Sequence, residues 1–182
     1  LIGAIWRWRT QTKTLLGGGS VSDMHVAGKA YSNVQTNDMK YDIYVGGAAG
    51  VLANPSTSGK NGSAYIKNVS VNNCIIESIG EDKMATYAAG IVAGIWWAST
   101  GYLQNSTVAN SSVTASSVSG KTYAGGVTGL VQNAAVEGCA AISTDVRSVS
   151  VNEEANAAGV LAWAQNWVAA TENVSAATIP SS

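Results

Sequence analysis

The chain has 182 residues, of which 46% are hydrophobic and only 12% are charged. Its formal net charge of −1 and its scattered basic residues argue against nucleic acid as a partner, because nucleic-acid-binding proteins carry a broad basic stripe. The high hydrophobic content excludes a disordered chain, and no apolar run approaches the roughly 20 residues of a membrane-spanning helix.

The opening residues LIGAIWRW are similar to the end of a phrase that recurs further along the chain, with Gly3 in the place later taken by Gly50. GSVSDMHV then supplies the second phrase of this first repeat, with Asp23 in the position that later repeats give to Asn. The intervening LLGGGS is interpreted as a flexible turn. Because the first repeat begins in its middle, we expect the chain to be part of a longer parent protein.

The recurring glycine-rich phrase occurs as YVGGAAGVLAN, YAAGIVAGIWW, YAGGVTGLVQ and NAAGVLAWAQN. Its shared glycine falls, at steps of 43, 36 and 33 residues, at Gly47, Gly90, Gly126 and Gly159. Glycine at a fixed place in a repeat is typical of a corner or of a close approach between neighbouring backbones.

A second phrase follows each copy of the first, as YIKNVSV, YLQNSTV, AVEGCAA and ATENVSA. Its fourth place holds Asn68, Asn105, Gly138 and Asn173. Asn beside a corner tolerates the left-handed backbone conformation and can form an amide ladder along a stack. The two phrases together indicate about five imperfect repeats of 33–43 residues, at approximately 1–40, 41–83, 84–121, 122–155 and 156–182.

Short runs such as NVSVN and VRSVSVN alternate apolar and polar residues, which predicts strands with one buried face. Repeated strand units cannot bury that face alone and must stack to do so. The sequence therefore predicts a single all-β domain folded as a parallel β-solenoid, in which NAAGVLAWAQN is strand and not helix. An antiparallel β-sandwich is the alternative, since it also has strands at short spacing.

The stretch YAGGVTGLVQNAAVEGCAA resembles the glycine-rich repeat, called the GLUG type, of large secreted bacterial surface proteins. That repeat has a G-G-[IV]-x-G-x phrase followed by an [IV]-x-N-C-x phrase. The chain departs from the pattern at GLVQ and at Cys139, which follows Gly138 where the pattern has Asn. The resemblance implies a β-helical stalk or adhesin segment with no catalytic residues.

The tryptophans are the most informative surface residues, at Trp6, Trp8, Trp96, Trp97, Trp163 and Trp167. The repeat alignment puts Trp6 in the same place as Trp96. Neighbours on a strand point to opposite faces, so Trp96 and Trp97 cannot both be interior unless the backbone bends there. An exposed tryptophan column could stack on sugar rings or dock a partner, but packing of these side chains under long loops is slightly favoured.

We predict no catalytic residue, no metal ligand and no cofactor. His25 aligns with Ser70 and Thr107 at positions that face outward, and a catalytic triad would also need an orienting acid and an exposed nucleophile, so we expect an exposed, solitary histidine. Cys74 and Cys139 are far apart, with no CxxC or histidine nearby, which excludes zinc. We favour two buried thiols over a disulfide, because free cysteine is among the most buried residue types.

Two carboxylates occupy the same place in successive repeats, just before the Asn position, at Glu137 and Glu172. A solenoid would place them about one strand spacing apart, roughly 4.7–4.9 Å, which is near the separation of the carboxylates in retaining glycosidases. The equivalent positions hold Lys67, Gln104 and Ser22, so the column is expected to be simply polar and solvent-facing.

The sequence therefore predicts a non-enzymatic structural or adhesive repeat module at the cell surface or outside the cell, as a stalk, adhesin or appendage segment. Its expected partners are other protein subunits or a longer parent chain, and glycans. One alternative is a carbohydrate-active β-helix, either a polysaccharide lyase or hydrolase or a phage-spike fragment. The other is a subunit of a filament, since open coil ends expose unpaired strand edges.

Overall fold

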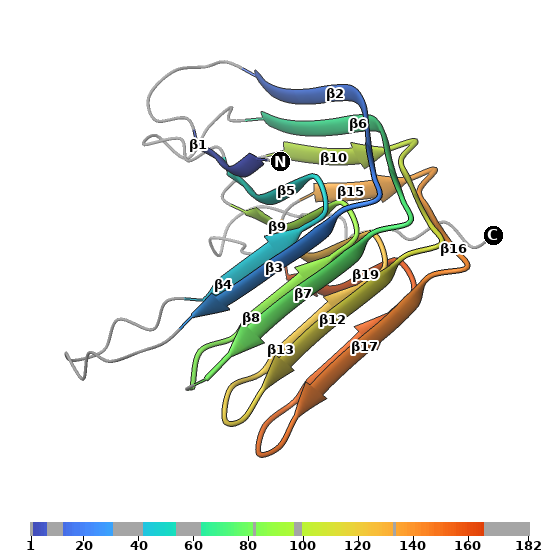
Figure 1. The fold of residues 1–182 in the computed structure, drawn as a ribbon. Coiled ribbons are helices and arrows are strands. Elements are labelled where there is room, and N and C mark those ends of the chain that lie inside the picture. Colours follow the sequence, from blue (N-terminus) through green and yellow to red (C-terminus); the bar gives the residue numbers. More distant parts are fainter. Residues whose placement is uncertain are drawn as a thin grey trace, which may run out of the picture.

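The chain winds as a parallel β-solenoid in the computed structural model, which describes residues 2–6, 13–30, 42–53, 63–81, 83–96, 100–132 and 134–165. Successive coils lie side by side, so that the strands of each sheet come from different repeats (Figure 1). All strand pairings within these ranges are parallel, as between Tyr87 and Tyr123 or between Val113 and Val146. This confirms the predicted solenoid and shows that the antiparallel sandwich is wrong.

Each coil passes in turn through four sheets, which we name A to D. Sheet A contains β1 (Ile2–Trp6), β5 (Ala49–Ala53), β9 (Val92–Trp96), β14 (Thr128–Gln132) and β19 (Leu161–Gln165). Sheet B contains β2 (Lys13–Ser22), β6 (Ser63–Asn72), β10 (Thr100–Gln104), β11 (Thr107–Ala109), β15 (Ala134–Glu137) and β16 (Ala140–Ile142). Sheet C contains β3 (His25–Ala30), β7 (Ile75–Gly80), β12 (Ser112–Ser117) and β17 (Asp145–Ser150). Sheet D contains β4 (Ile43–Gly46), β8 (Thr86–Ala89), β13 (Thr122–Gly125) and β18 (Ala155–Ala158).

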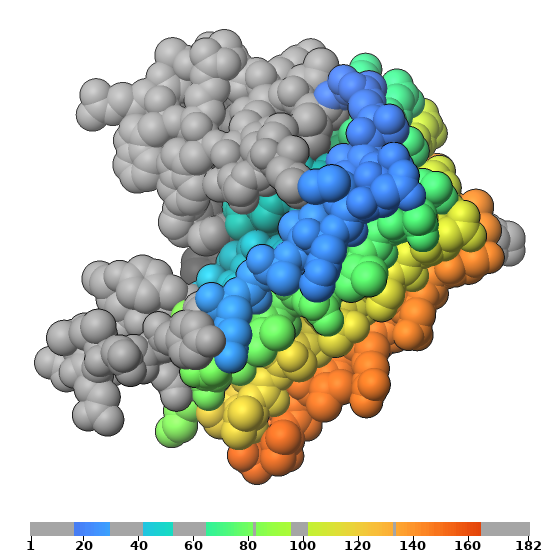
Figure 2. All heavy atoms as spheres, in the orientation of Figure 1, coloured from blue at the N-terminus to red at the C-terminus, as the bar shows by residue number. Residues whose placement is uncertain are grey.

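The outer surface of sheet C shows the stacking most directly. Figure 2 shows the coils there as adjacent ridges, from β3 in blue through β7 and β12 to β17 in orange. The last repeat also forms strands β18 and β19, as its alignment with the earlier glycine-rich phrases predicts. None of the described segments is an apolar helix of membrane-spanning length.

The interior is filled by columns of aliphatic side chains that repeat from coil to coil. Ile66 in β6 pairs in register with Leu103 in β10, and Ile76 in β7 pairs with Val113 in β12. All four side chains are fully buried in one hydrophobic core. Burial of each contributes roughly 1.5–3 kcal/mol, so the alternation in the sequence becomes a continuous apolar core along the stack.

The recurring glycines form a column, as predicted. A Cβ atom added to Gly47 would lie 2.2 Å from the carbonyl oxygen of Gly90, and one added to Gly126 would lie 2.0 Å from that of Gly159. No real Cβ atom approaches a backbone oxygen so closely, so only glycine allows neighbouring coils to pack here. The column stands where the chain leaves sheet D and enters sheet A.

The asparagines lie at the corners of sheet B in the left-handed conformation, as predicted for Asn68 (φ 57°) and Asn105 (φ 49°). A second corner follows each of them by five residues, at Asn73 and Asn110. At this second corner Asn73 Nδ2 donates to Asp23 Oδ1 at 2.7 Å. This bond joins an amide to a carboxylate, whereas the amide ladder was predicted for the column of Asn68 and Asn105, where it stays a prediction. The predicted corner residue Asn173 lies outside the described residues.

The register of the first coil differs from the prediction. Gly17 pairs with Lys67 and Gly19 pairs with Val69, which places Gly18 (φ 64°) in the column of Asn68. Asp23 therefore belongs to the second corner, and the LLGGGS segment is part of strand β2 instead of a turn. Glycine adopts a positive φ as readily as asparagine does, so a search for asparagine alone missed the first corner.

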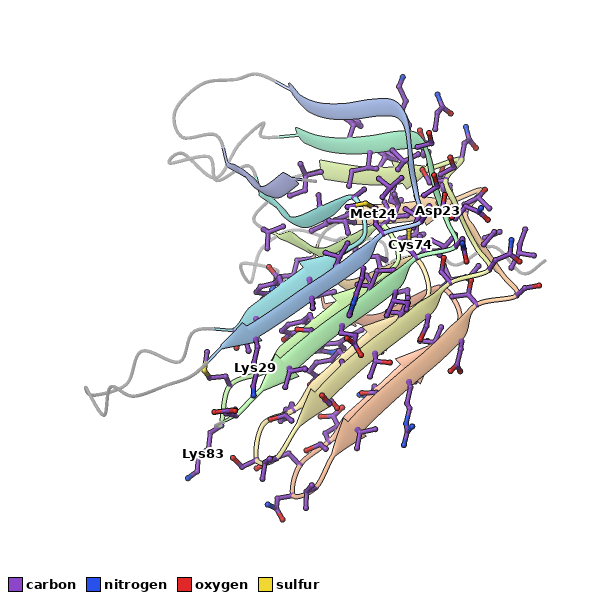
Figure 3. All side chains as sticks on the ribbon, viewed as in Figure 1. Asp23, Met24, Lys29, Cys74 and Lys83 are labelled. Carbon is purple, nitrogen blue, oxygen red and sulfur yellow. The ribbon has the colours of Figure 1, made fainter. Side chains whose placement is uncertain are left out.

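After five of the eight left-handed corners among the described residues, the next residue carries a hydroxyl or thiol that donates to the carbonyl oxygen two residues earlier. Ser106 Oγ donates to Gln104 O at 2.9 Å, and Cys74 Sγ donates to Asn72 O at 3.2 Å. Figure 3 shows Cys74 at this turn, next to Asp23 and Met24 of the preceding coil. Cys74 is buried, Cys139 is half-buried, and both are free thiols, which confirms the prediction of thiols over a disulfide.

Candidate binding surfaces

The predicted tryptophan face is placed only in part. Trp6 and Trp96 both pair in register with Ala53, so they fall in one column of sheet A as the alignment predicts. Trp8, Trp97 and Trp167 lie outside the described residues. A shared tryptophan surface therefore stays a prediction. For Trp163 the structure shows a ring contact, with Tyr123.

Trp163 belongs to a column of stacked aromatic rings that crosses four coils, which we name the aromatic ladder (Tyr44, Tyr87, Tyr123 and Trp163). The ring centroids of Tyr44 and Tyr87 are 4.6 Å apart, and those of Tyr87 and Tyr123 are 5.0 Å apart. The indole of Trp163 stacks on Tyr123 at 5.0 Å with an interplanar angle of 12°. Offset stacks of this kind stabilise a fold by about 0.5–1.5 kcal/mol per pair beyond area burial.

The three tyrosines stack because they hold the same position in strands β4, β8 and β13. In β18 that position is Asn156, and Trp163 from the following strand supplies the ring in its place. Tyr87 and Tyr123 are 3% and 2% exposed and form a second apolar cluster with residues of sheet A. The ladder is therefore mainly a packing element, which favours the packing interpretation for Trp163.

The hydroxyl groups of the ladder end among carboxylates. Tyr44 OH donates to Asp42 Oδ2 at 3.3 Å, and Tyr123 OH donates to Glu154 Oε2 at 3.4 Å. Burial raises the pKa of Tyr44 and Tyr87 well above the usual value, and burial together with Glu154 raises the pKa of Tyr123 to about 12. The hydroxyls thus stay protonated, and the ladder carries no charge at neutral pH.

Glu154 is an exposed carboxylate at the end of this ladder. Its pKa is lowered, first by a hydrogen bond from the Asn156 side chain and then by one from Lys121. The Lys121 Nζ atom lies 3.3 Å from Glu154 Oε2, and both side chains are about half exposed. An exposed pair of this kind contributes little stability. Because its pKa is lowered, Glu154 is an ionised surface group.

A second aromatic surface lies on the outer face of sheet B, where Tyr65 of β6 pairs in register with Tyr102 of β10. The two rings stack with centroids 5.6 Å apart and an interplanar angle of 3°. They alternate with the fully buried Ile66 and Leu103, so both rings point away from the core. We name these residues the outer tyrosine pair. The sequence carries a signal for this pair that the tryptophans do not, because both second phrases begin with tyrosine, in YIKNVSV and YLQNSTV.

Polar side chains run beside the outer tyrosine pair in a row formed by Lys67, Gln104 and Glu137. Gln104 Nε2 donates to Glu137 Oε2 at 2.8 Å, and Glu137 is exposed. The alignment had placed Ser22 in this row, which is wrong. Ser22 pairs with Asn72, and Gly17 pairs with Lys67 in its place. Glu172, the predicted neighbour of Glu137, lies outside the described residues.

His25 is exposed on the outer face of sheet C, as predicted, but in a different column. It pairs in register with Ile75, whereas the alignment had placed it with Ser70 and Thr107. Its Nε2 atom lies 2.6 Å from Glu77 Oε2, and the two side chains are 57% and 38% exposed. The five-residue shift of the first coil explains the error.

Within the described ranges, no three His, Cys, Asp or Glu side chains come together as metal ligands would. No family model, no curated protein and no solved structure matches this chain.

Proposed function

We propose that this chain is a non-enzymatic structural and adhesive repeat module of an extracellular or cell-surface protein. The observation that carries the proposal is the unbroken column of Gly47, Gly90, Gly126 and Gly159, because it shows coils stacked in one register. Hydrogen bonds continue the same register across the column, as from Gly126 N to Ala158 O at 2.9 Å. A stack of this kind suits a stalk that holds a binding surface away from its point of attachment.

The resemblance to GLUG-type repeats supports the location outside the cell and a longer parent chain as partner. The corner hydrogen bonds give that resemblance a physical meaning, because the Asn-Cys step of the repeat is the left-handed corner followed by a donating thiol. Serine fills the same place after Asn105 and Asn110, with hydrogen bonds of 2.9 and 2.7 Å. The motif thus describes how a coil turns, which is a structural role.

The outer tyrosine pair supports an adhesive role in addition to the structural one. Aromatic side chains are enriched in the cores of recognition surfaces, and Tyr65 and Tyr102 point away from the core beside a row of hydrogen-bonding groups. We take glycans as the partner class of this surface.

An assay that separates binding from turnover tests the proposal. The chain is incubated with a panel of immobilised polysaccharides, and both retained protein and newly formed sugar chain ends are measured. We expect retention on at least one polysaccharide with no chain cleavage. Formation of new chain ends in proportion to protein would overturn the proposal and favour a carbohydrate-active β-helix.

A further inference from the structure

The outer face of sheet B has a gap in its column of rings. The register places Tyr65, Tyr102 and Ala135 in consecutive coils at the same position. Ala135 is half-buried and follows the buried Ala134, and it precedes Val136, which belongs to the core. Ala135 therefore faces outward, at a level where the two preceding coils each carry a ring.

The gap has the thickness of one ring. Tyr65 and Tyr102 are spaced at 5.6 Å with nearly parallel planes, close to the strand separation of about 4.8 Å. A methyl group at Ala135 leaves the Tyr102 face on that side without an aromatic partner from β15. A flat ring placed over Ala135 would continue the stack at the same spacing.

The sides of the gap are polar. Glu137 lies two residues from Ala135 on the same face of β15, about 6.6 Å along the strand, and is exposed. Its Oε2 atom accepts from Gln104 Nε2 at 2.8 Å, so the carboxylate is held in place while its other oxygen can accept from a ligand. Lys67, also exposed, continues this row in β6.

We propose that the gap over Ala135, between Tyr102 and Glu137, binds one neutral pyranose ring with equatorial hydroxyl groups. Such a ring presents a flat C–H surface to Tyr102 and directs hydroxyl groups sideways, where Glu137 accepts and Gln104 offers its amide. An aromatic side chain of a protein partner would fill the gap equally well but would leave the polar row unused. This inference deepens the proposed adhesive function and rests on it.

The test is a titration of isotope-labelled protein with cellohexaose, followed by the amide shifts of the whole chain. We expect saturable shifts centred on Tyr102, Ala135 and Glu137. Tyr102→Ala should weaken binding about tenfold, the loss of one stacking contact of roughly 1.4 kcal/mol. Tyr102→Phe keeps the ring and should restore most of the affinity.

The decisive variant is Ala135→Tyr, which fills the gap with the ring that the column lacks. It should abolish binding of cellohexaose while the protein stays folded. Thr114→Tyr is the matched control, because Thr114 alternates with the buried Val113 and Ala115 and faces outward on sheet C. It adds the same side chain elsewhere and should leave the affinity unchanged.

Three results would overturn the inference. They are the absence of saturable shifts with cellohexaose, unchanged affinity in Ala135→Tyr, and binding of N-acetyltyrosine amide in place of cellohexaose at the same residues. None of them involves polysaccharide cleavage, so the proposed structural role would stand. Cleavage with intact binding would instead refute the non-enzymatic function and leave the sugar site in place.

Discussion

Gly90 lies directly against Gly126 of the next coil, so that a Cβ atom on Gly90 would be 2.2 Å from the carbonyl oxygen of Gly126 and 2.5 Å from a methyl carbon of Val108. Neither neighbour is the free end of a flexible side chain. We therefore expect Gly90→Ala to lower the free energy of unfolding by about 1–3 kcal/mol or more through overpacking, as measured by denaturant unfolding.

Gly159 provides the control for this prediction. It occupies the same column, yet a Cβ atom added there meets nothing within 4 Å among the described residues. Gly159→Ala should change the free energy of unfolding by no more than about 0.5 kcal/mol. Equal losses in the two variants would show that the coils do not stack through this column.

A partly buried hydroxyl pair offers a route to a more stable protein. Ser148 Oγ of sheet C lies 2.7 Å from Thr122 Oγ1 of sheet D. One coil earlier the same two positions hold Ala115 and Thr86, and Thr86 Oγ1 is buried with no hydrogen-bond partner among the described residues. Ala115→Ser should recreate the pair and raise the free energy of unfolding by about 1 kcal/mol.

The Thr86→Val background checks this mechanism. Valine keeps the shape of threonine and removes the hydroxyl that the new serine would contact. In that background Ala115→Ser should destabilise the protein, because its own hydroxyl then loses that partner. The same gain from Ala115→Ser in both backgrounds would contradict the predicted contact.

The aromatic ladder predicts unfolding at alkaline pH. Each tyrosine pKa is raised in the folded protein above the ordinary value of 10.0, and that of Tyr123 is raised to about 12. The unfolded chain therefore loses protons first as the pH increases. Stability should be fully present below pH 10 and should fall as the pH rises towards 12, measured by denaturant unfolding across this range.

Tyr87→Phe isolates the contribution of one hydroxyl. Phenylalanine keeps the ring between Tyr44 and Tyr123 but cannot ionise. The variant should unfold with a shallower pH dependence above pH 10 than the unmodified chain. An unchanged dependence would assign the alkaline transition to groups outside the ladder.

A charge introduced into the core should destabilise the protein far more than the removal of an exposed side chain. Val127 is fully buried directly after Gly126, so Val127→Asp should cost roughly 4 kcal/mol or more and unfold the chain, by circular dichroism. Ile91→Asp, at the equivalent place one coil earlier, should do the same. His25→Ala removes an exposed pair with Glu77 and should cost less than about 1 kcal/mol.

Much of the architecture was predictable from the repeats. Gly47, Gly90 and Gly126 recur with the same drift as Asn68 and Asn105, and only a chain that winds can keep both columns. The corner conformation and the free thiols follow from local chemistry, because asparagine accepts a positive φ and a cysteine placed after it can donate to the carbonyl two residues earlier. These properties depend on neighbours in sequence, so the amino-acid pattern determines them.

Contacts between coils were decided by the tertiary structure alone. Gly18 and Asp23 both suit a left-handed corner, and only the pairing with β6 assigns each to its column. Trp163 completes the ladder from a strand that does not carry the tyrosines, and Ala135 interrupts the outer column of rings. Such contacts join residues that are one whole coil apart, and the variable coil length hides their alignment until the backbone register is known.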